Sequence, residues 1–366
     1  MSVSLDEHRL GGLRWIVLAG PDREAFLALG EHVRGELASP EETWPMLPRL
    51  RQHVSVPPGR DHLASVRRVT EERFGEERAE LAAFAAGAAV PFEDLVLLNL
   101  RGDLGWTDAR LGCSDLAWRR DRSVIAHNED GALSDVGRCG LLTLTGNGRP
   151  PVTAFWYPGF LPANAFAVTG DGLVWTIDHL PVAVPGPGAG RHFVGRALQR
   201  AAQSVDDVIG YLRDHPSAGG FAYMAGDRGG RVVNVEAAAG RHAVAEAGPR
   251  PLLWHTNHSR YVPGAEPSAA GTSVARGETL NALAAPAQEP GASWFFDILT
   301  SPPPAGVRSD PGPDGIGLTT LCTLVADLTA GQASVAARGE RPVTIALADL
   351  AEGNPPARIA DPEGSR

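Results

Sequence analysis

The chain has 366 residues, and its hydrophobic content of 43% is sufficient for one large globular unit or two closely packed ones. A formal net charge of -10 argues against nucleic acid as a partner, because phosphate backbones are bound by clustered cations. All 33 basic residues are arginine, and the absence of lysine excludes phosphate-loop, pyridoxal Schiff-base and Ser-Lys acyl-enzyme chemistry.

The first hundred residues are predicted to be mainly helical. Apolar positions after Gly20 and Pro21 indicate one helix, and residues 61–86 show the pattern of a long helix. Pro91 is placed to begin a further short helix. We expect residues 104–111 to form an irregular, exposed loop, because they show neither a helical nor a strand pattern.

From Gly112 onward the pattern changes to short β-rich runs. We predict one group of strands over residues 123–127, 141–145, 152–156, 165–169 and 173–177, and a second group over residues 221–225, 231–237, 242–247 and 252–256. Two helices are predicted between these groups, over residues 191–202 and 204–215, the second with Ser204 as its N-cap. Helices over residues 273–283 and 293–299 precede a loop, a hairpin across residues 318–338 and a loose tail after Ala351.

This order of elements predicts an α/β (α+β) fold built in layers. Several connections are too short for crossovers, so part of the sheet structure should be antiparallel. The change of character at Gly112 divides the chain into a helical segment, residues 1–112, and a region of strands and helices, residues 113–366.

Gly112 and Cys113 lie at the join of these two parts. Glycine tolerates backbone angles that other residues avoid, and a thiol can attack the preceding carbonyl when that peptide bond is strained. Water would resolve the resulting thioester and leave Cys113 as a new N-terminus. Its free α-amine, with a pKa of about 7.7 to 8.0, is suited to accept the thiol proton. Cys113 would then supply both nucleophile and base.

Such a site also requires an oxyanion donor and a carboxylate that orients the α-amine, and two segments contain candidates. Residues 126–130, Ala-His-Asn-Glu-Asp, follow a predicted strand that returns beside Cys113. Residues 254–258, Trp-His-Thr-Asn-His, end an apolar run where an Asn side chain can present its amide protons to an oxyanion.

Together these residues resemble the self-cleaving acyl-coenzyme A:isopenicillin N (6-aminopenicillanic acid) acyltransferase family of N-terminal nucleophile (Ntn) cysteine hydrolases. The resemblance covers most of the chain and rests on Glu80-Leu81 through Asn99 and Asp103, Gly112-Cys113, Asn128-x-Asp130, Thr256-Asn257-His258 and the strand pair from Cys322 to Gly339. It implies an αββα sandwich of two mainly antiparallel sheets between helical layers. It also implies autocatalytic cleavage into an α-chain, residues 1–112, and a catalytic β-chain, residues 113–366, that stay associated.

The resemblance further implies roles for individual residues. Cys113 would form the thioester, Asp130 would orient its amine, and Asn257 would form the oxyanion hole. Asn128 would organise the strand beside the nucleophile, and Arg308 falls near where such enzymes carry an active-site arginine.

His127 and Arg276 are candidate substrate-binding residues. The expected substrate is a small acylated amine, amino acid or peptide-like metabolite, and an acyl-CoA is a possible acyl donor. We expect no cofactor and no metal. Whether water or an amine takes the acyl group from Cys113 is left open, because it depends on the shape of the pocket.

Two other readings compete with this one. A metal-assisted hydrolase would use His127, His255, His258 and Asp130, and a non-catalytic binding or scaffold protein would keep the fold without cleaving itself. No stretch approaches the roughly 20 apolar residues that span a bilayer, and the N-terminus lacks a signal-peptide pattern, so we expect a cytoplasmic protein with no membrane partner.

Overall fold

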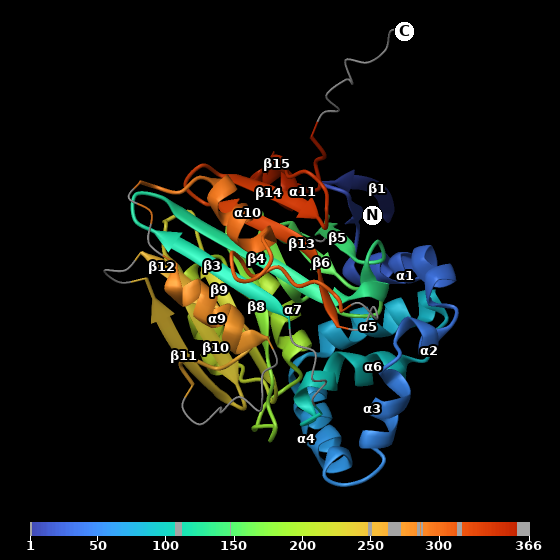
Figure 1. Ribbon diagram of the computed structural model, residues 1–366. Helices are drawn as coiled ribbons and strands as arrows, with labels where there is room; N and C mark the ends of the chain where they lie inside the picture. Colours follow the sequence, from blue (N-terminus) through green and yellow to red (C-terminus); the bar gives the residue numbers. More distant parts are fainter. Residues whose placement is uncertain are drawn as a thin grey trace.

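The computed structural model describes residues 2–106, 112–146, 148–247, 251–262, 272–283, 286, 288–312 and 317–356. Across these ranges the strands form two sheets, one of nine strands and one of six, stacked between layers of helices (Figure 1). Within the described part of the chain, every pair of neighbouring strands is antiparallel except β2 and β5, which are parallel.

The nine-stranded sheet contains, in spatial order, β1 (Ser4–Leu10), β2 (Leu13–Ala19), β5 (Gly140–Thr145), β6 (Val152–Trp156), β7 (Asn164–Thr169), β8 (Val174–Leu180), β9 (Gly220–Gly226), β10 (Val232–Ala238) and β11 (Arg241–Glu246). The six-stranded sheet contains β12 (Leu252–His255), β3 (Cys113–Arg119), β4 (Ser123–Ala132), β13 (Leu318–Asp327), β14 (Gln332–Ala337) and β15 (Val343–Ala346).

The helices form two separate outer layers, and Figure 1 shows α1 to α6 of the first layer gathered away from α9 and α10. The layer beside the nine-stranded sheet contains α1 (Asp22–Val33), α2 (Pro40–Thr43), α3 (Leu47–His53), α4 (Gly59–Arg73), α5 (Gly75–Ala88), α6 (Phe92–Leu100), α7 (Arg191–Ala201) and α8 (Val205–Asp214). The layer on the six-stranded sheet contains α9 (Ser273–Ala282) and α10 (Ala292–Thr300), and α11 (Leu347–Glu352) packs into the core between the sheets.

Successive side chains of the strands point to opposite faces of each sheet, and they therefore contribute to separate hydrophobic cores. Trp15 of β2 points into the core between the two sheets, whereas its neighbour Ile16 points into the core beneath the helices. On the six-stranded sheet, Ala117 faces the inter-sheet core and Trp118 faces α10. Successive side chains of a strand lie on opposite faces, so an almost continuously apolar strand can serve two cores. The predicted αββα sandwich is confirmed.

The N-terminal segment differs from its prediction. β1 and β2 were expected to be helical, but they form the edge of the nine-stranded sheet, and β2 pairs with β5 from beyond Cys113. The long helix expected over residues 61–86 is two helices, α4 and α5, separated at Phe74. Residues 1–112 are therefore built into the sheet that the rest of the chain completes.

After Gly112, the residue ranges predicted for helices and strands lie close to those observed in the structure. Ser204 is the N-cap of α8, and its side chain accepts from the backbone N–H of Asp207. The expected loop over residues 104–111 and the expected tail fall partly on residues 107–111 and 357–366, which lie outside the described residues. None of the described helices is long and apolar enough to cross a membrane.

Candidate active site

Cys113 is the first residue of β3, and the β3–β4 ladder places it beside a row of polar residues. Cys113 pairs with Glu129 and Asp115 pairs with His127 in the antiparallel register. Side chains two residues apart share a face of the sheet, so these four lie together. All four are buried in the interior of the molecule.

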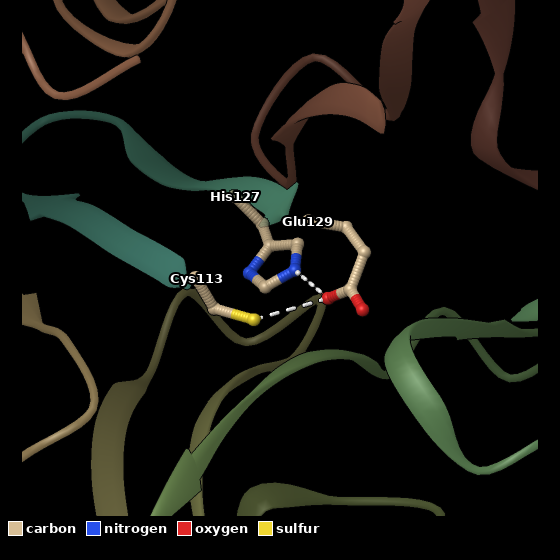
Figure 2. A group of neighbouring side chains, drawn as sticks. All are labelled: Cys113, His127 and Glu129. Carbon is tan, nitrogen blue, oxygen red and sulfur yellow. Dashed lines mark hydrogen bonds and ion pairs between the residues drawn. The ribbon is translucent and has the colours of Figure 1, made fainter. Parts of the chain in front are cut away.

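Glu129 is in direct contact with the Cys113 thiol (Figure 2). Its Oε2 accepts from Cys113 Sγ at 3.2 Å and lies 3.2 Å from His127 Nε2. Its other oxygen, Oε1, accepts from the hydroxyl of Tyr157 at 2.5 Å. Donors on both sides therefore fix the carboxylate against the sulfur.

His127 lies between two carboxylates. Its Nδ1 is 2.8 Å from Asp115 Oδ1, opposite the contact of Nε2 with Glu129. Burial by itself would lower the pKa of His127, but the charge of Asp115 and the hydrogen bonds to both acids outweigh burial and raise that pKa to about 10. The imidazole is therefore positively charged near neutral pH and donates from both nitrogens.

A second buried group of the same type adjoins the first. His255 lies between Asp178, at 3.0 Å, and Glu236, at 2.9 Å. Ligand atoms of Asp178, Asp115 and His127 lie within 4.8 Å of one another, and Asp115 Oδ2 and Asp178 Oδ1 are buried without a hydrogen-bond partner. Burial, followed by the charge of Asp178, raises the pKa of Asp115 to about 6. The nearby charge of Asp178 thus favours the protonated form of Asp115.

Gly112, which directly follows the expected exposed loop, is buried. Its φ lies outside the left-handed region, so backbone freedom does not explain the glycine. A Cβ at this position would lie 2.5 Å from the Cβ of Asp130 and 2.5 Å from Leu318. Glycine is required because Asp130 and Leu318 occupy the space that a side chain would need.

Asp130 packs against this peptide bond. Ser309 donates to its Oδ2 at 2.5 Å and Thr320 donates to its Oδ1 at 2.6 Å. Burial raises the pKa of Asp130, while the Arg276 charge and the two hydroxyl groups act in the opposite direction. The carboxyl is thus held in one orientation beside the Gly112-Cys113 bond.

Arg276 connects Cys113 to Asn257. Its guanidinium donates to the backbone oxygen of Cys113, to Ser114 Oγ at 2.7 Å and to Asn257 Oδ1 at 2.6 Å. The Asn257 Nδ2 donates to the backbone oxygen of His179 at 3.1 Å. Arg276 was expected to bind substrate, but it is 3% exposed and its contacts instead hold the start of β3 and the Asn257 amide.

Of the other predicted site residues, Asn128 has the structural position expected of it, whereas His127 does not reach the cavity. Asn128 opposes Ser114 in the ladder, donates to the Leu299 backbone oxygen at 2.5 Å and accepts from Thr323 at 2.6 Å, so it ties β4 to its neighbours. His127 is fully buried behind Glu129 and does not line the cavity beside Cys113. Its expected role in substrate binding is therefore not supported by its position.

Arg308 is not brought to Cys113. Its guanidinium donates to Asp310 at 2.8 Å and to the backbone oxygen of Thr300 at 3.0 Å, and it lines a different cavity. Asp310, two residues further along the chain, accepts the hydrogen bonds of this guanidinium and keeps it away from Cys113. The structure gives no support to an active-site role for Arg308.

A cavity of about 180 Å³ opens beside Cys113. Its lining includes the polar residues Glu129, Asp130 and Tyr157 and the apolar residues Ile177 and Phe221. Residues from before Cys113 also contribute, namely Met46, Arg101, Gly102 and Trp106. The cavity therefore has an apolar surface suited to an acyl group next to a nucleophilic side chain.

The thiol itself is protonated in this environment. Burial raises the pKa of Cys113 well above its ordinary value, and the charges of Glu129, Asp178 and Asp130 raise it further, against a hydrogen bond with the Asp130 backbone N–H. Because the thiolate is the nucleophile, a base must remove this proton before Cys113 can attack a carbonyl.

The four residues of the metal-hydrolase hypothesis do not converge. Among the described residues, the groups compact enough for a metal ion are Cys113-His127-Glu129 and Asp115-His127-Asp178. His255 instead bridges Asp178 and Glu236, and His258 contacts Thr256 and Ser273.

Glu129, Tyr157 and Asp178 were not predicted as site residues. Glu129 had one usable signal, since it lies in the same short polar run as His127 and Asp130. Tyr157 and Asp178 lie after β6 and within β8, and only the stacking of the second sheet on the first brings them to Cys113 and Asp115.

The sequence profile of the acyl-coenzyme A:6-aminopenicillanic acid acyl-transferase family matches residues 118–341. The chain belongs to this family. Membership places the protein in a family of acyl-transferring enzymes. The matched range begins after Cys113, so it does not test Cys113 as the nucleophile.

Solved structures of Ntn hydrolases are also similar to this acyltransferase-family chain. Penicillin V acylase from Agrobacterium tumefaciens is 11% identical with a TM-score of 0.43, over 66% of this chain and 89% of that one. A mutant of conjugated bile acid hydrolase from Clostridium perfringens is 13% identical with a TM-score of 0.37, over 67% of this chain and 95% of that one. An N-acylethanolamine-hydrolyzing acid amidase ortholog from Caenorhabditis elegans is 10% identical with a TM-score of 0.41, over 59% of this chain and 93% of that one. No curated protein sequence matches the chain.

Proposed function

We propose that this family member cleaves its own Gly112-Cys113 bond and then uses Cys113 as an N-terminal nucleophile on amides or thioesters. The observation that carries the proposal is the contact between the Cys113 thiol and Glu129, in a cavity directly beside the bond to be cleaved. The family description, which names acyl-CoA and a β-lactam amine, supports acyl transfer as the reaction type.

In the uncleaved chain the nitrogen of Cys113 is an amide and cannot act as the base. Glu129 is the group in contact with the thiol, so it takes the thiol proton, and the thiolate attacks the carbonyl carbon of Gly112. The Cys113 nitrogen then gains a proton and leaves as an amine. A thioester now joins the Gly112 carbonyl to Sγ, and water hydrolyses it to a Gly112 carboxylate and a free thiol.

After cleavage the α-amine of Cys113 becomes the base for turnover. It accepts the thiol proton, and the thiolate attacks the carbonyl of the substrate to give a Cys113 thioester and a protonated leaving group. Asp130, fixed by Ser309 and Thr320 beside the bond that is cleaved, orients the new ammonium group. Hydrolysis by water or transfer to an amine completes the cycle.

The developing oxyanion requires a donor that is already in place before reaction. Asn257 is the candidate, since Arg276 holds its amide oxygen and also holds the Cys113 backbone. Arg276 is then a positioning residue that fixes the donor relative to the nucleophile.

The two products of self-cleavage would remain one protein. β1 and β2 belong to the same sheet as β5 to β11, so separating residues 1–112 would break the β2–β5 pairing and expose the core beneath the helices.

The substrate is a small acylated amine, amino acid or peptide-like compound, with acyl-CoA as a possible acyl donor, and no metal takes part.

The decisive experiment is the intact mass of freshly purified protein under denaturing conditions, beside the Cys113→Ala variant. Two fragments that meet at Gly112/Cys113 in the wild type alone, together with turnover of an acyl substrate, support the proposal. Full-length protein in both samples after long incubation would refute self-cleavage and favour a non-processing binding protein.

A further inference from the structure

The segment that contains Asn257 is not held in place by strand pairing. β12 lies at the end of the six-stranded sheet, and its last pair in the ladder joins His255 to Asp115 of β3. Asn257 follows this pair, outside the ladder, and yet its side chain is completely buried. A donor to a developing oxyanion has to be fixed before the reaction, so contacts other than the ladder must hold this segment.

Glu236 of β10 provides contacts on both sides of Asn257. Before Asn257, the Oε1 of Glu236 accepts from His255 Nε2 at 2.9 Å. After Asn257, the two carboxylate oxygens accept from Ser259 Oγ at 2.6 Å and from three successive backbone N–H groups at 2.5, 3.0 and 2.8 Å, those of Arg260, Tyr261 and Val262. One carboxylate therefore receives five hydrogen bonds from a single stretch of chain.

The contact between Glu236 and His255 joins two charged groups. Burial by itself would raise the pKa of Glu236, but the hydrogen bond and charge of His255, with the donors after Asn257, lower that pKa to about 2. Burial would lower the pKa of His255, whereas Asp178 and Glu236 raise it to about 9. Hydrogen bonds between charged groups are stronger than neutral ones, so this contact is suited to fix a loop.

The same stretch of chain is also bonded to β8. His255 Nδ1 lies 3.0 Å from Asp178, and the backbone oxygen of the next residue, His179, accepts from Asn257 Nδ2 at 3.1 Å. β8 and β10 belong to the nine-stranded sheet, whereas β12 belongs to the six-stranded sheet with Cys113. The position of Asn257 relative to Cys113 thus depends on contacts between the two sheets.

We infer that Glu236 is a positioning residue for the acyl-transfer reaction, and that its carboxylate places the Asn257 amide by holding the chain on both sides of it. The inference rests on the proposed function, which assigns Asn257 to the oxyanion. Glu236 is fully buried and does not line the cavity beside Cys113, so it acts only through the segment that it holds. Arg276 holds the oxygen of the same amide from α9.

The variant Glu236→Gln tests the inference. A glutamine side chain has one acceptor oxygen, so at least two of the five hydrogen bonds are lost, and its NH₂ group faces other donors. We expect the kcat of the cleaved enzyme for para-nitrophenyl phenylacetate to fall at least about tenfold. KM should change by less than about twofold, because the oxyanion forms only in the transition state.

A double-mutant cycle separates positioning from a general loss of stability. In the Asn257→Ala background, Glu236→Gln should lower kcat by less than about twofold, since no amide is left to position. The control is Glu77→Gln, which alters a buried acid of α5 bonded to Arg200 and should have the same effect in both backgrounds. Equal losses of kcat from Glu236→Gln in the two backgrounds overturn the inference.

Hydrogen exchange measures the hold on the segment without turnover. In the Cys113→Ala chain, Glu236→Gln should speed the exchange of the amides of residues 260–262 at least about tenfold, and unchanged exchange would overturn the inference. If Glu236→Gln does not fold, the half-buried Ser259 is changed to Ala instead. That variant should lower kcat at least about twofold, and the loss should disappear in the Asn257→Ala background; no loss, or one that persists there, contradicts the inference.

The outcomes distinguish this inference from the proposed function. Turnover by the wild type, with equal losses in both backgrounds, leaves the proposed function standing and removes Glu236 as a positioning residue. Absence of both self-cleavage and turnover in the wild type refutes the proposed function, and this inference falls with it whatever hydrogen exchange shows.

Discussion

Glu129 stands opposite Cys113 in the β3–β4 ladder, with its Oε2 3.2 Å from the Cys113 sulfur. The position follows from strand register alone, since a two-residue shift of β4 would bring His127 to the thiol instead. His127 lies behind Glu129 and supplies the positive charge next to it. Under the proposed self-cleavage, Glu129 therefore provides a proton acceptor before any α-amine exists.

Replacement of Glu129 by Gln should slow self-cleavage by at least about 10²-fold, because the amide cannot accept the thiol proton. The rate is followed by intact mass after synthesis of the full chain. Glu278→Gln, the same change at an exposed position of α9, is the control. Cleavage of the Glu129 variant at the wild-type rate would show that another group removes the proton.

Replacement of Asp130 by Asn should reduce cleavage, turnover or both by more than about tenfold, because the neutral amide no longer attracts the Cys113 ammonium group. Asp310→Asn, which alters an exposed acid bonded to Arg308, provides the matched comparison. Wild-type behaviour of the Asp130 variant in both assays would remove this residue from the site.

Replacement of Asn257 by Ala should lower kcat by about 10²-fold or more if its amide stabilises the oxyanion. KM should change much less, because the interaction forms mainly in the transition state. The control is Asn281→Ala on the exposed side of α9. A loss confined to KM would assign Asn257 to ground-state binding.

The free energy of unfolding should fall as pH rises from about 6.5 to about 10. The pKa of His127 is raised to about 10 and that of His255 to about 9, so the stability that each contributes is complete below the unfolded pKa of 6.5 and is lost as pH passes the folded value. Urea unfolding of the Cys113→Ala chain, which cannot cleave itself, measures this slope.

In that background, His127→Gln should flatten the alkaline decline, whereas His242→Gln at an exposed position should leave it unchanged. At acid pH the sign is reversed. Burial lowers the pKa of His179 and His192 well below 6.5, so the stability that these two histidines contribute should fall as pH drops below 6.5, whereas Asp115, with its pKa raised to about 6, acts in the opposite direction. A flat profile across both limbs would contradict the charge states assigned to these histidines.

Removal of metal should leave turnover within about twofold of the untreated enzyme, since the proposed chemistry uses a thiol, an amine and amides. The test is activity after chelation and dialysis, with metal content measured on the same sample. Loss of activity that zinc restores would instead assign a metal to the Cys113-His127-Glu129 group.

The sequence by itself determined a layered α/β fold with antiparallel pairing and most strands after Gly112. These features depend on local patterns, namely alternation along strands, turn residues and the order of short polar motifs, and each is readable within a few neighbours. β2 was missed because it buries side chains in cores on both of its faces, with Trp15 in one and Ile16 in the other, so its apolar run does not alternate and resembles a buried helix.

Only the tertiary structure decided which polar groups meet. Tyr157 and Glu129 are 28 positions apart, and Arg276 and Cys113 are separated by 163, so no spacing rule connects them. The same holds for Arg308, which its neighbour Asp310 engages away from Cys113, and for Gly112, whose missing side chain reflects the packing of Asp130 and Leu318. Strand patterns follow from chain-local geometry, whereas a buried site depends on which faces of two stacked sheets are pressed together.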